Sequence, residues 1–299
     1  MAEAAAVREQ GAQVAPPARS RPSWSWLGLV PFFLFCTAFM FLPVAFLVIG
    51  SLNDTTGNLT VKNYADLSTG IIPGAFANSI EISVVTAIAG GVFGFLLAAS
   101  VILGGLPRIL RTALMTFSGV ASNFAGIPLA LAFIFTVGAT GFMTVILQGV
   151  GLTGYRGVNL TSKIGVEVVY MYFQFPLMVL IIAPALEGLR REWREAAENM
   201  GASAFQYWRH VALPILTPSI LGTMILLFGN SFGAQATAFQ LTGGTLPLVT
   251  LVISSQIRGD VLHNPGLGYA MAMGMVGIMG ISIFLYSLLQ RRAERWLRS

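Results

Sequence analysis

Long apolar stretches separated by short polar segments dominate the chain. Six of these stretches reach the length of about 20 residues that a helix needs to cross the hydrocarbon core of a bilayer. We expect spans at roughly Trp26–Leu52, Phe76–Leu103, Thr112–Val137, Ile164–Leu186, Ile215–Ala238 and Leu267–Leu289. The pattern therefore predicts an all-α polytopic membrane protein with six transmembrane helices.

The composition supports this prediction. Only 10% of the residues are charged and 55% are hydrophobic, whereas a soluble domain has about 25% charged residues. So few charged residues cannot cover the surface of a protein of this size that faces water. The composition therefore excludes a soluble enzyme and a nucleic-acid-binding module. The single cysteine, Cys36, cannot form an internal disulfide, and no Cys/His cluster suggests a metal site.

The two ends of the chain differ from the apolar region. Residues 1–23 are polar and rich in Pro and Ala, and we expect them to be a disordered cytoplasmic N-terminus rather than a cleaved signal peptide. Residues 24–290 are expected to form the six-helix transmembrane domain. Residues 291–299 are expected to form a basic cytoplasmic tail.

Positive charge is distributed unevenly over the segments that connect the spans. In membrane proteins Lys and Arg concentrate on the cytoplasmic side. If both termini are cytoplasmic, only four of the 17 Lys and Arg fall outside, and these are Lys62, Arg156, Lys163 and Arg258. We therefore predict a multi-pass protein with both termini in the cytoplasm.

The segment between the fourth and fifth spans, residues 187–214, is too long for a simple turn. Apolar residues recur at helical spacing as far as Met200, and Gly201 suits the left-handed position that ends a helix. Ser203 suits the cap of a second short helix, which Pro214 is expected to close. The pattern predicts a helix–Gly–helix elbow on the cytoplasmic face. Such an elbow fits either a docking surface or an amphipathic hairpin that rests on lipid headgroups.

The same loop resembles the EAA motif of the membrane-spanning permease subunits of binding-protein-dependent ABC importers of the type I fold. The residues that carry this resemblance are Glu195, Ala196, Ala197, Gly201, Val211, Leu213 and Pro214. The family usually has Ile where this chain has Val211. The layout of six spans extends the resemblance from about Trp26 to Leu289, so it implies the type I permease fold for the whole membrane domain.

The resemblance also implies a role for the loop and a set of partners. In that family the loop is a coupling helix that docks on the ATP-hydrolysing subunit. Carried over by position, Glu195, Ala196, Ala197 and Gly201 form the docking elbow. The other expected docking residues of the same loop are Trp193, Phe205, Leu213 and Pro214. The implied partners are an ABC ATPase dimer, a second permease subunit (a paralogue or a second copy) and a substrate-binding protein, all at the bacterial plasma (inner) membrane.

The sequence contains no phosphate-binding loop of the pattern G-x-x-x-x-G-K-[ST]. We therefore expect a transport subunit rather than an enzyme, with no catalytic residue, metal or cofactor of its own, and with ATP and Mg²⁺ bound by the partner ATPase. Gly90 and Gly94 in the second span form a small-xxx-small pair, which predicts close packing against another helix.

Several polar side chains lie inside the predicted spans, where they are costly and therefore candidates for a translocation path. These residues are Glu81, Asn123, Glu167, Gln174, Asn230, Ser231 and Gln235. Hydrogen bonding between helices is the alternative role, and the two glutamates can also stay hydrated at the ends of their spans. Pro128, shortly after Asn123, is expected to kink the third span.

Together these features predict the permease subunit of an ATP-driven importer that works by alternating access. An ATP-independent channel or secondary transporter would not need the loop motif, and no catalytic constellation supports an intramembrane enzyme. Two further regions, Asn63–Leu67 with Phe76–Ser79 and Phe232–Ala238 with Gln256–Val261, resemble the subgroup that serves polyamines, iron(III) and phosphonates. Within it, Glu81 and Glu167 favour a polyamine such as spermidine or putrescine, while phosphonate, iron(III) or another small solute stays open.

Overall fold

The structure is a computed structural model that describes residues 28–54, 57–152, 154–258 and 263–298, with side chains as far as residue 291. The predicted disordered stretch 1–23 lies outside the described residues. In the predicted basic tail, only the backbone is described beyond residue 291. Apart from an isolated bridge between Asn53 and Leu59, the described residues contain no β-structure.

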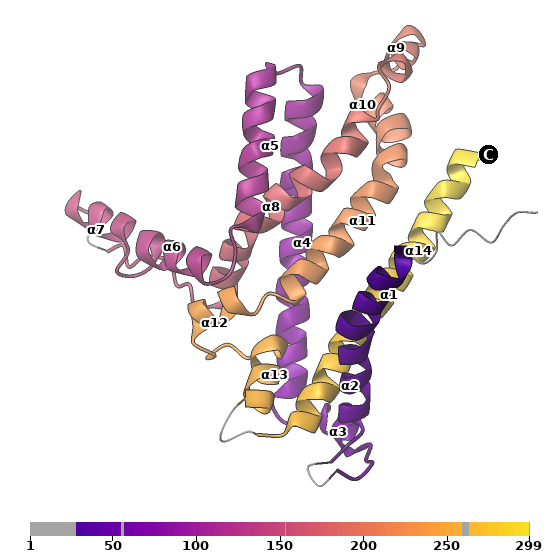
Figure 1. The fold of residues 1–299 in the computed structure, drawn as a ribbon. Coiled ribbons are helices and arrows are strands. Elements are labelled where there is room, and N and C mark those ends of the chain that lie inside the picture. The colour runs from indigo at the N-terminus through magenta and orange to yellow at the C-terminus, as the bar shows by residue number, and fades with distance from the viewer. Residues whose placement is uncertain (1–27, 55–56, 153, 259–262, 299) are drawn as a thin grey trace, which may run out of the picture. The chain divides into compact units, whose positions relative to one another are not determined.

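The described residues form a series of helices, drawn in Figure 1. In chain order these are α1 (Val30–Cys36), the π-helical turn η2 (Thr37–Phe41), α2 (Leu42–Ser51), α3 (Lys62–Asp66), α4 (Ile72–Leu103), α5 (Arg108–Asn123), α6 (Ile127–Val137), α7 (Phe142–Gly149), α8 (Lys163–Glu187), α9 (Arg191–Asn199), α10 (Ala204–Tyr207), the π-helical turn η3 (Trp208–Ala212), α11 (Leu213–Phe232), α12 (Ala236–Thr242), α13 (Val249–Arg258) and α14 (Pro265–Arg298). The structure divides after Phe46 into two units, and the candidate site described below lies within the second.

Six helical segments are long and apolar enough to cross a membrane. They are Val30–Ser51, Ile72–Leu103, Ile127–Gly149, Lys163–Glu187, Ala204–Phe232 and Pro265–Arg291. The predicted all-α architecture with six transmembrane helices is therefore confirmed, although two of the predicted spans need correction.

The third predicted span, Thr112–Val137, is not one helix. α5 ends at Asn123 and α6 begins at Ile127. Between them Gly126 has φ 77° and ψ −150°, a conformation that only glycine adopts without strain. The kink expected at Pro128 is therefore a complete break, and the apolar segment that can span the membrane is Ile127–Gly149, formed by α6 and α7.

The fifth predicted span, Ile215–Ala238, is also interrupted. α11 ends at Phe232 and a separate helix, α12, begins at Ala236. Gln235 is the residue that precedes α12, so it lies in the break rather than within a continuous span. The helix starts earlier than predicted, because α10, η3 and α11 follow one another without a break from Ala204.

Helices α4 and α8 pack closely along their lengths, and α8 also packs on α5 (Figure 1). A Cβ atom added at Gly90 would lie 2.7 Å from the Cβ of Gln174, and one added at Gly94 would lie 2.5 Å from the carbonyl oxygen of Phe175. Only glycine fits at either position, so the close packing predicted from the small-xxx-small pair is confirmed. Around this crossing, buried apolar residues of α4, α8, α11, α13 and α14 form the larger core cluster.

Candidate functional site

The loop between α8 and α11 contains the predicted elbow. α9 ends at Asn199, and Gly201, two residues later, has φ 79°. The Gly201 amide donates to the carbonyl of Glu198 at 2.9 Å, and the Ala202 amide donates to the carbonyl of Ala197 at 3.0 Å. These two bonds form a Schellman motif, the helix ending that glycine at this position favours. The left-handed glycine predicted from the sequence is therefore confirmed.

The second helix of the loop begins with a capping box. The Ser203 hydroxyl accepts from the Gln206 amide at 3.3 Å, and the Gln206 side chain accepts from the Ser203 amide at 2.7 Å. The predicted cap is confirmed, but the predicted closure at Pro214 is wrong. The helix passes through η3 into α11, because the wider π-turn makes room for the proline ring and Pro214 has no N–H to leave unpaired.

The elbow has an inner and an outer face. Ala197, Tyr207 and Ala212 are buried in a small cluster of their own. Glu195 and Ala196 are exposed. Of the other predicted docking residues, Gly201 is exposed, Trp193, Leu213 and Phe205 are 36%, 39% and 70% exposed, and Pro214 is partly buried. Ala197 therefore holds the two helices of the elbow together, whereas Glu195 and Ala196 stand on its free surface.

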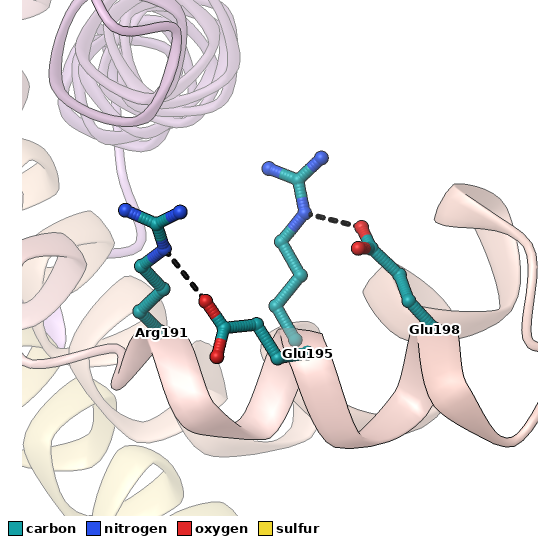
Figure 2. Close-up of polar contacts among 4 residues, drawn as sticks. Arg191, Glu195 and Glu198 are labelled. Carbon is teal, nitrogen blue, oxygen red and sulfur yellow. Dashed lines mark hydrogen bonds and ion pairs between the residues drawn. The ribbon is translucent and has the colours of Figure 1, made fainter.

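Two ion pairs run along α9 (Figure 2). Arg191 Nε donates to Glu195 Oε1 at 2.8 Å, and Arg194 Nε donates to Glu198 Oε1 at 2.9 Å. Exposed pairs at this spacing stabilise a helix by only about 0.3–0.5 kcal/mol each. Their main effect is to fix the orientation of the side chains. At the base of the loop, Arg111 of α5 pairs with Glu187 at the end of α8.

Some of the polar span residues meet in the core. Gln174 of α8 is fully buried, and its Nε2 donates to the carbonyl of Leu227 at 2.8 Å, while its Oε1 accepts from Asn230 at 3.3 Å. Ser231, 4% exposed, shares a 2.9 Å hydrogen bond with Thr86 of α4. Gln174 and Ser231 therefore link α4, α8 and α11, while Asn230 is exposed.

Two other predicted residues lie beside the helix breaks. Asn123, at the end of α5, is exposed and donates to the carbonyl of Gly119 at 2.9 Å. Gln235, just before α12, is also exposed. The breaks themselves are joined by Thr237, whose hydroxyl accepts from the Gly126 amide at 2.8 Å and donates to its carbonyl at 3.2 Å. The Tyr170 hydroxyl also donates to the Ala234 carbonyl at 2.7 Å.

The sequence did not single out Thr86 and Thr237 as linking residues. A threonine in an apolar helix usually bonds to the carbonyl one turn earlier, as Thr86 also does with Ile82. Nothing in the sequence marks the two that also bond to a distant part of the chain. Only their positions in the folded chain reveal this role.

The two glutamates lie together at the end of the spans opposite the elbow. Glu81 of α4 pairs with Lys163 at the start of α8 at 2.7 Å. Glu167, one turn further along α8 and half-buried, lies within electrostatic reach of both. The three side chains form a small cluster with one net negative charge. Within the described residues, no group of three His, Cys, Asp or Glu side chains is placed to hold a metal ion.

A family model described as "Binding-protein-dependent transport system inner membrane component" matches residues 90–295. The spermidine/putrescine transport permease PotB of Haemophilus influenzae is 26% identical over 91% of this chain and 94% of its own length. A probable sulfate transport permease, cysT of Nephroselmis olivacea, is 25% identical over 93% and 90%.

Solved structures show a similar fold. A chain from a bacterial ABC transporter involved in the import of the acidic polysaccharide alginate matches with a TM-score of 0.72 over 90% of this chain and 95% of its own, at 16% identity. A second structure of a bacterial alginate ABC transporter, in complex with a periplasmic protein that holds an alginate pentasaccharide, gives a TM-score of 0.71. At this level of identity the likeness concerns the fold alone.

Proposed function

The chain belongs to the family of binding-protein-dependent transport system inner membrane components, and from this premise we propose that it carries a small solute and docks on a separate ATPase through loop 187–214. The family predicted from the loop motif is confirmed, and with it the identification as a multi-pass permease of an ABC importer. The proposed assembly adds an ATPase dimer that binds ATP and Mg²⁺, a second permease subunit and a substrate-binding protein. Both termini are proposed to lie in the cytoplasm.

The docking role is supported by the form of the elbow. Its internal bonds, from Ala202 and Gly201 back to α9, are satisfied within the loop itself, so the exposed face of α9 is available to a partner. Glu195, Ala196 and Phe205 are exposed. A rigid, exposed element with small and aromatic side chains fits a groove on another protein. The proposed coupling role rests on this exposed elbow, whose backbone bonds are satisfied within the loop.

We propose that the translocation path of the solute includes the exposed side-chain amides. Asn123, Asn230 and Gln235 are polar and exposed in the second unit, and an exposed amide at membrane depth needs water or another subunit rather than lipid. Gln174 and Ser231 are bonded within the core and are proposed to hold α4, α8 and α11 in place behind these residues.

For the solute we propose a polyamine. The PotB relative is named for spermidine and putrescine, and the cluster of Glu81, Lys163 and Glu167 keeps one net negative charge that would attract a cation. The relatives named for sulfate are similar to this chain to the same degree, so an oxyanion is the competing outcome that the experiment must separate.

The test is uptake into proteoliposomes that contain the permease, its ATPase and its binding protein. We expect ATP-dependent entry of labelled spermidine, and no entry of labelled sulfate. Gly201→Ala should sharply reduce uptake while membrane insertion is kept, because an alanine at positive φ costs about 1–2 kcal/mol and distorts the elbow. No atom lies within 4 Å of the added Cβ, so the effect is conformational rather than steric.

Gly188→Ala is the matched control, because Gly188 lies in the same loop at φ −71°, which any residue adopts. Its uptake should stay near that of the unaltered protein. Normal uptake by Gly201→Ala at equal membrane abundance would contradict the docking role. Uptake of sulfate instead of spermidine would contradict the solute proposal and leave the docking role intact.

A further inference from the structure

A cleft of about 530 Å³ lies between the elbow and the end of α4. Its apolar wall includes Ile102 and Leu103, the last residues of α4, and Trp208 of η3. Its polar wall is formed by α9 and the residue before it. Figure 1 shows α9 and the turn from α4 to α5 at the same end of the second unit.

The cleft lies at the level where lipid headgroups are expected. α4 has 32 residues, so it is about 48 Å long, whereas the hydrocarbon core is about 30 Å thick. A helix of this length can extend beyond the hydrocarbon core, and Arg108 and Arg111, shortly after its end, indicate that its last turn lies at the cytoplasmic boundary. Tryptophan also concentrates at this boundary, and Trp208 lines the cleft. A ligand in the cleft can thus have its polar part among the arginines and its apolar part against α4.

Three arginines line the polar wall: Arg190, Arg191 and Arg194. Arg191 and Arg194 each use Nε for the bond to a glutamate on α9. The terminal nitrogens of Arg191 point away from the Glu195 carboxylate in Figure 2. These nitrogens form the fork that binds phosphate oxygens in pairs. The glutamates therefore orient the two guanidinium groups without using their terminal donors.

Arg190 supplies the charge that is not balanced locally. Its guanidinium lies over the Trp193 ring, 5.7 Å from the centroid, and in the described part of the chain it forms no ion pair with a carboxylate. With Glu195 and Glu198 also lining the cleft, three cations face two anions. The cleft therefore carries one net positive charge at headgroup level.

We propose that this cleft binds the phosphate headgroup of an anionic membrane lipid, held by Arg190, Arg191 and Arg194, with the acyl chains lying along the end of α4. The proposal rests on the membrane fold and not on the solute or the docking role. A lipid bound here would touch both the elbow and a spanning helix, so the anionic lipid content of the membrane would influence how the two are connected.

The test measures binding of phosphatidylglycerol to the full chain in nanodiscs of zwitterionic lipid, by native mass spectrometry. The variant replaces Arg190, Arg191 and Arg194 by Gln. At about fivefold for each arginine near a headgroup, the affinity should fall roughly 100-fold. The control replaces Arg108, Arg258 and Arg291 by Gln, which removes the same charge elsewhere, and should retain binding. Equal loss in both variants, or in neither, would overturn the proposal.

Two further measurements distinguish a lipid site from a disturbed fold and from a soluble ligand. Glu198→Gln removes a negative charge from the cleft and keeps an oxygen that can accept from Arg194, so it should tighten lipid binding by roughly fivefold. A variant that acted only by disturbing the fold would not tighten binding, and unchanged or weaker binding contradicts the proposal. Soluble glycerol phosphate should compete poorly with the lipid, and equal competition would assign the cleft to a soluble phosphate compound instead.

Discussion

Single glycines serve different physical purposes in this chain. Gly201 is needed because its φ is positive, and the space around it is open. Gly94 has an ordinary φ, but there is no space for a Cβ atom at its position. The distinction matters for mutagenesis, because the first kind of glycine affects the shape of one loop and the second affects the packing of two helices. The crossing of α4 and α8 depends on the second kind.

Gly94→Ala should destabilise the membrane domain. The added Cβ would lie 2.5 Å from the Phe175 carbonyl oxygen and 2.6 Å from the Cβ of Met178, and overpacking of this kind costs about 1–3 kcal/mol. Gly74→Ala is the control on the same helix, since no atom lies within 4 Å of its added Cβ. Thermal unfolding in detergent should show a lower midpoint for Gly94→Ala only. Equal midpoints would mean that the two helices do not cross this closely.

Thiol labelling can separate core residues from those of the proposed path. In a Cys36→Ser background, Asn230→Cys should react with small aqueous reagents, because Asn230 is exposed and the reactive thiolate needs water. Gln174→Cys should be inert, because Gln174 is fully buried.

Phe39→Cys provides the lipid control for this labelling. Phe39 is exposed on a strongly apolar span without charged residues, so its cysteine should meet acyl chains and stay unreactive. If Asn230→Cys were as inert as Phe39→Cys in every nucleotide state, Asn230 would not line an aqueous path.

At the scale of helices, the two breaks are the main departure from six simple spans. The break after α5 and the break after α11 meet through Thr237 and Gly126, so α6 and α12 are held as a pair. Breaks within a membrane domain are tolerated only where neighbouring groups satisfy the freed backbone. Thr237 does this for both the amide and the carbonyl of Gly126.

Thr237→Val should weaken this connection. Valine has the same shape but leaves the partly buried Gly126 amide without its partner, at a cost of about 1 kcal/mol or more. Thr223→Val is the control, because Thr223 is equally buried but bonds only to the Ser219 carbonyl of its own helix. The unfolding midpoint should fall for Thr237→Val and change little for Thr223→Val. The reverse order would show that the breaks are not joined by this hydroxyl.

At the scale of the whole molecule, the chain is one component of a transport system. It has no phosphate-binding loop, and its family consists of inner membrane components of transport systems that work with a binding protein. The energy for transport is therefore proposed to reach it from another subunit through the elbow.

The purified chain in lipid should hydrolyse no ATP. Hydrolysis should appear when the ATPase subunit is added and should rise further with solute-loaded binding protein, because the loaded protein favours the closed state of the assembly. Phosphate release measured in the three mixtures gives the comparison. Hydrolysis by the chain alone, with contaminating ATPases excluded, would contradict the proposed division of roles.

Features that depend on neighbouring residues could be predicted from the sequence. The lengths of most spans follow from runs of apolar residues. The left-handed Gly201 after α9 and the cap at Ser203 follow from bonds between residues a few positions apart. The small-xxx-small pair in α4 also predicted a close crossing, because it depends only on the shape of one helix face. In each case the determining interactions are local.

The rest was decided by tertiary structure. Whether a polar side chain lines a path or joins two helices depends on how each helix is rotated, and the sequence places Gln174 and Asn230 equally well in either role. The structure buries Gln174 against Leu227 and exposes Asn230. Likewise, the break near Gly126 requires a partner such as Thr237, 111 residues away. Such long-range contacts exist only once the helices have packed.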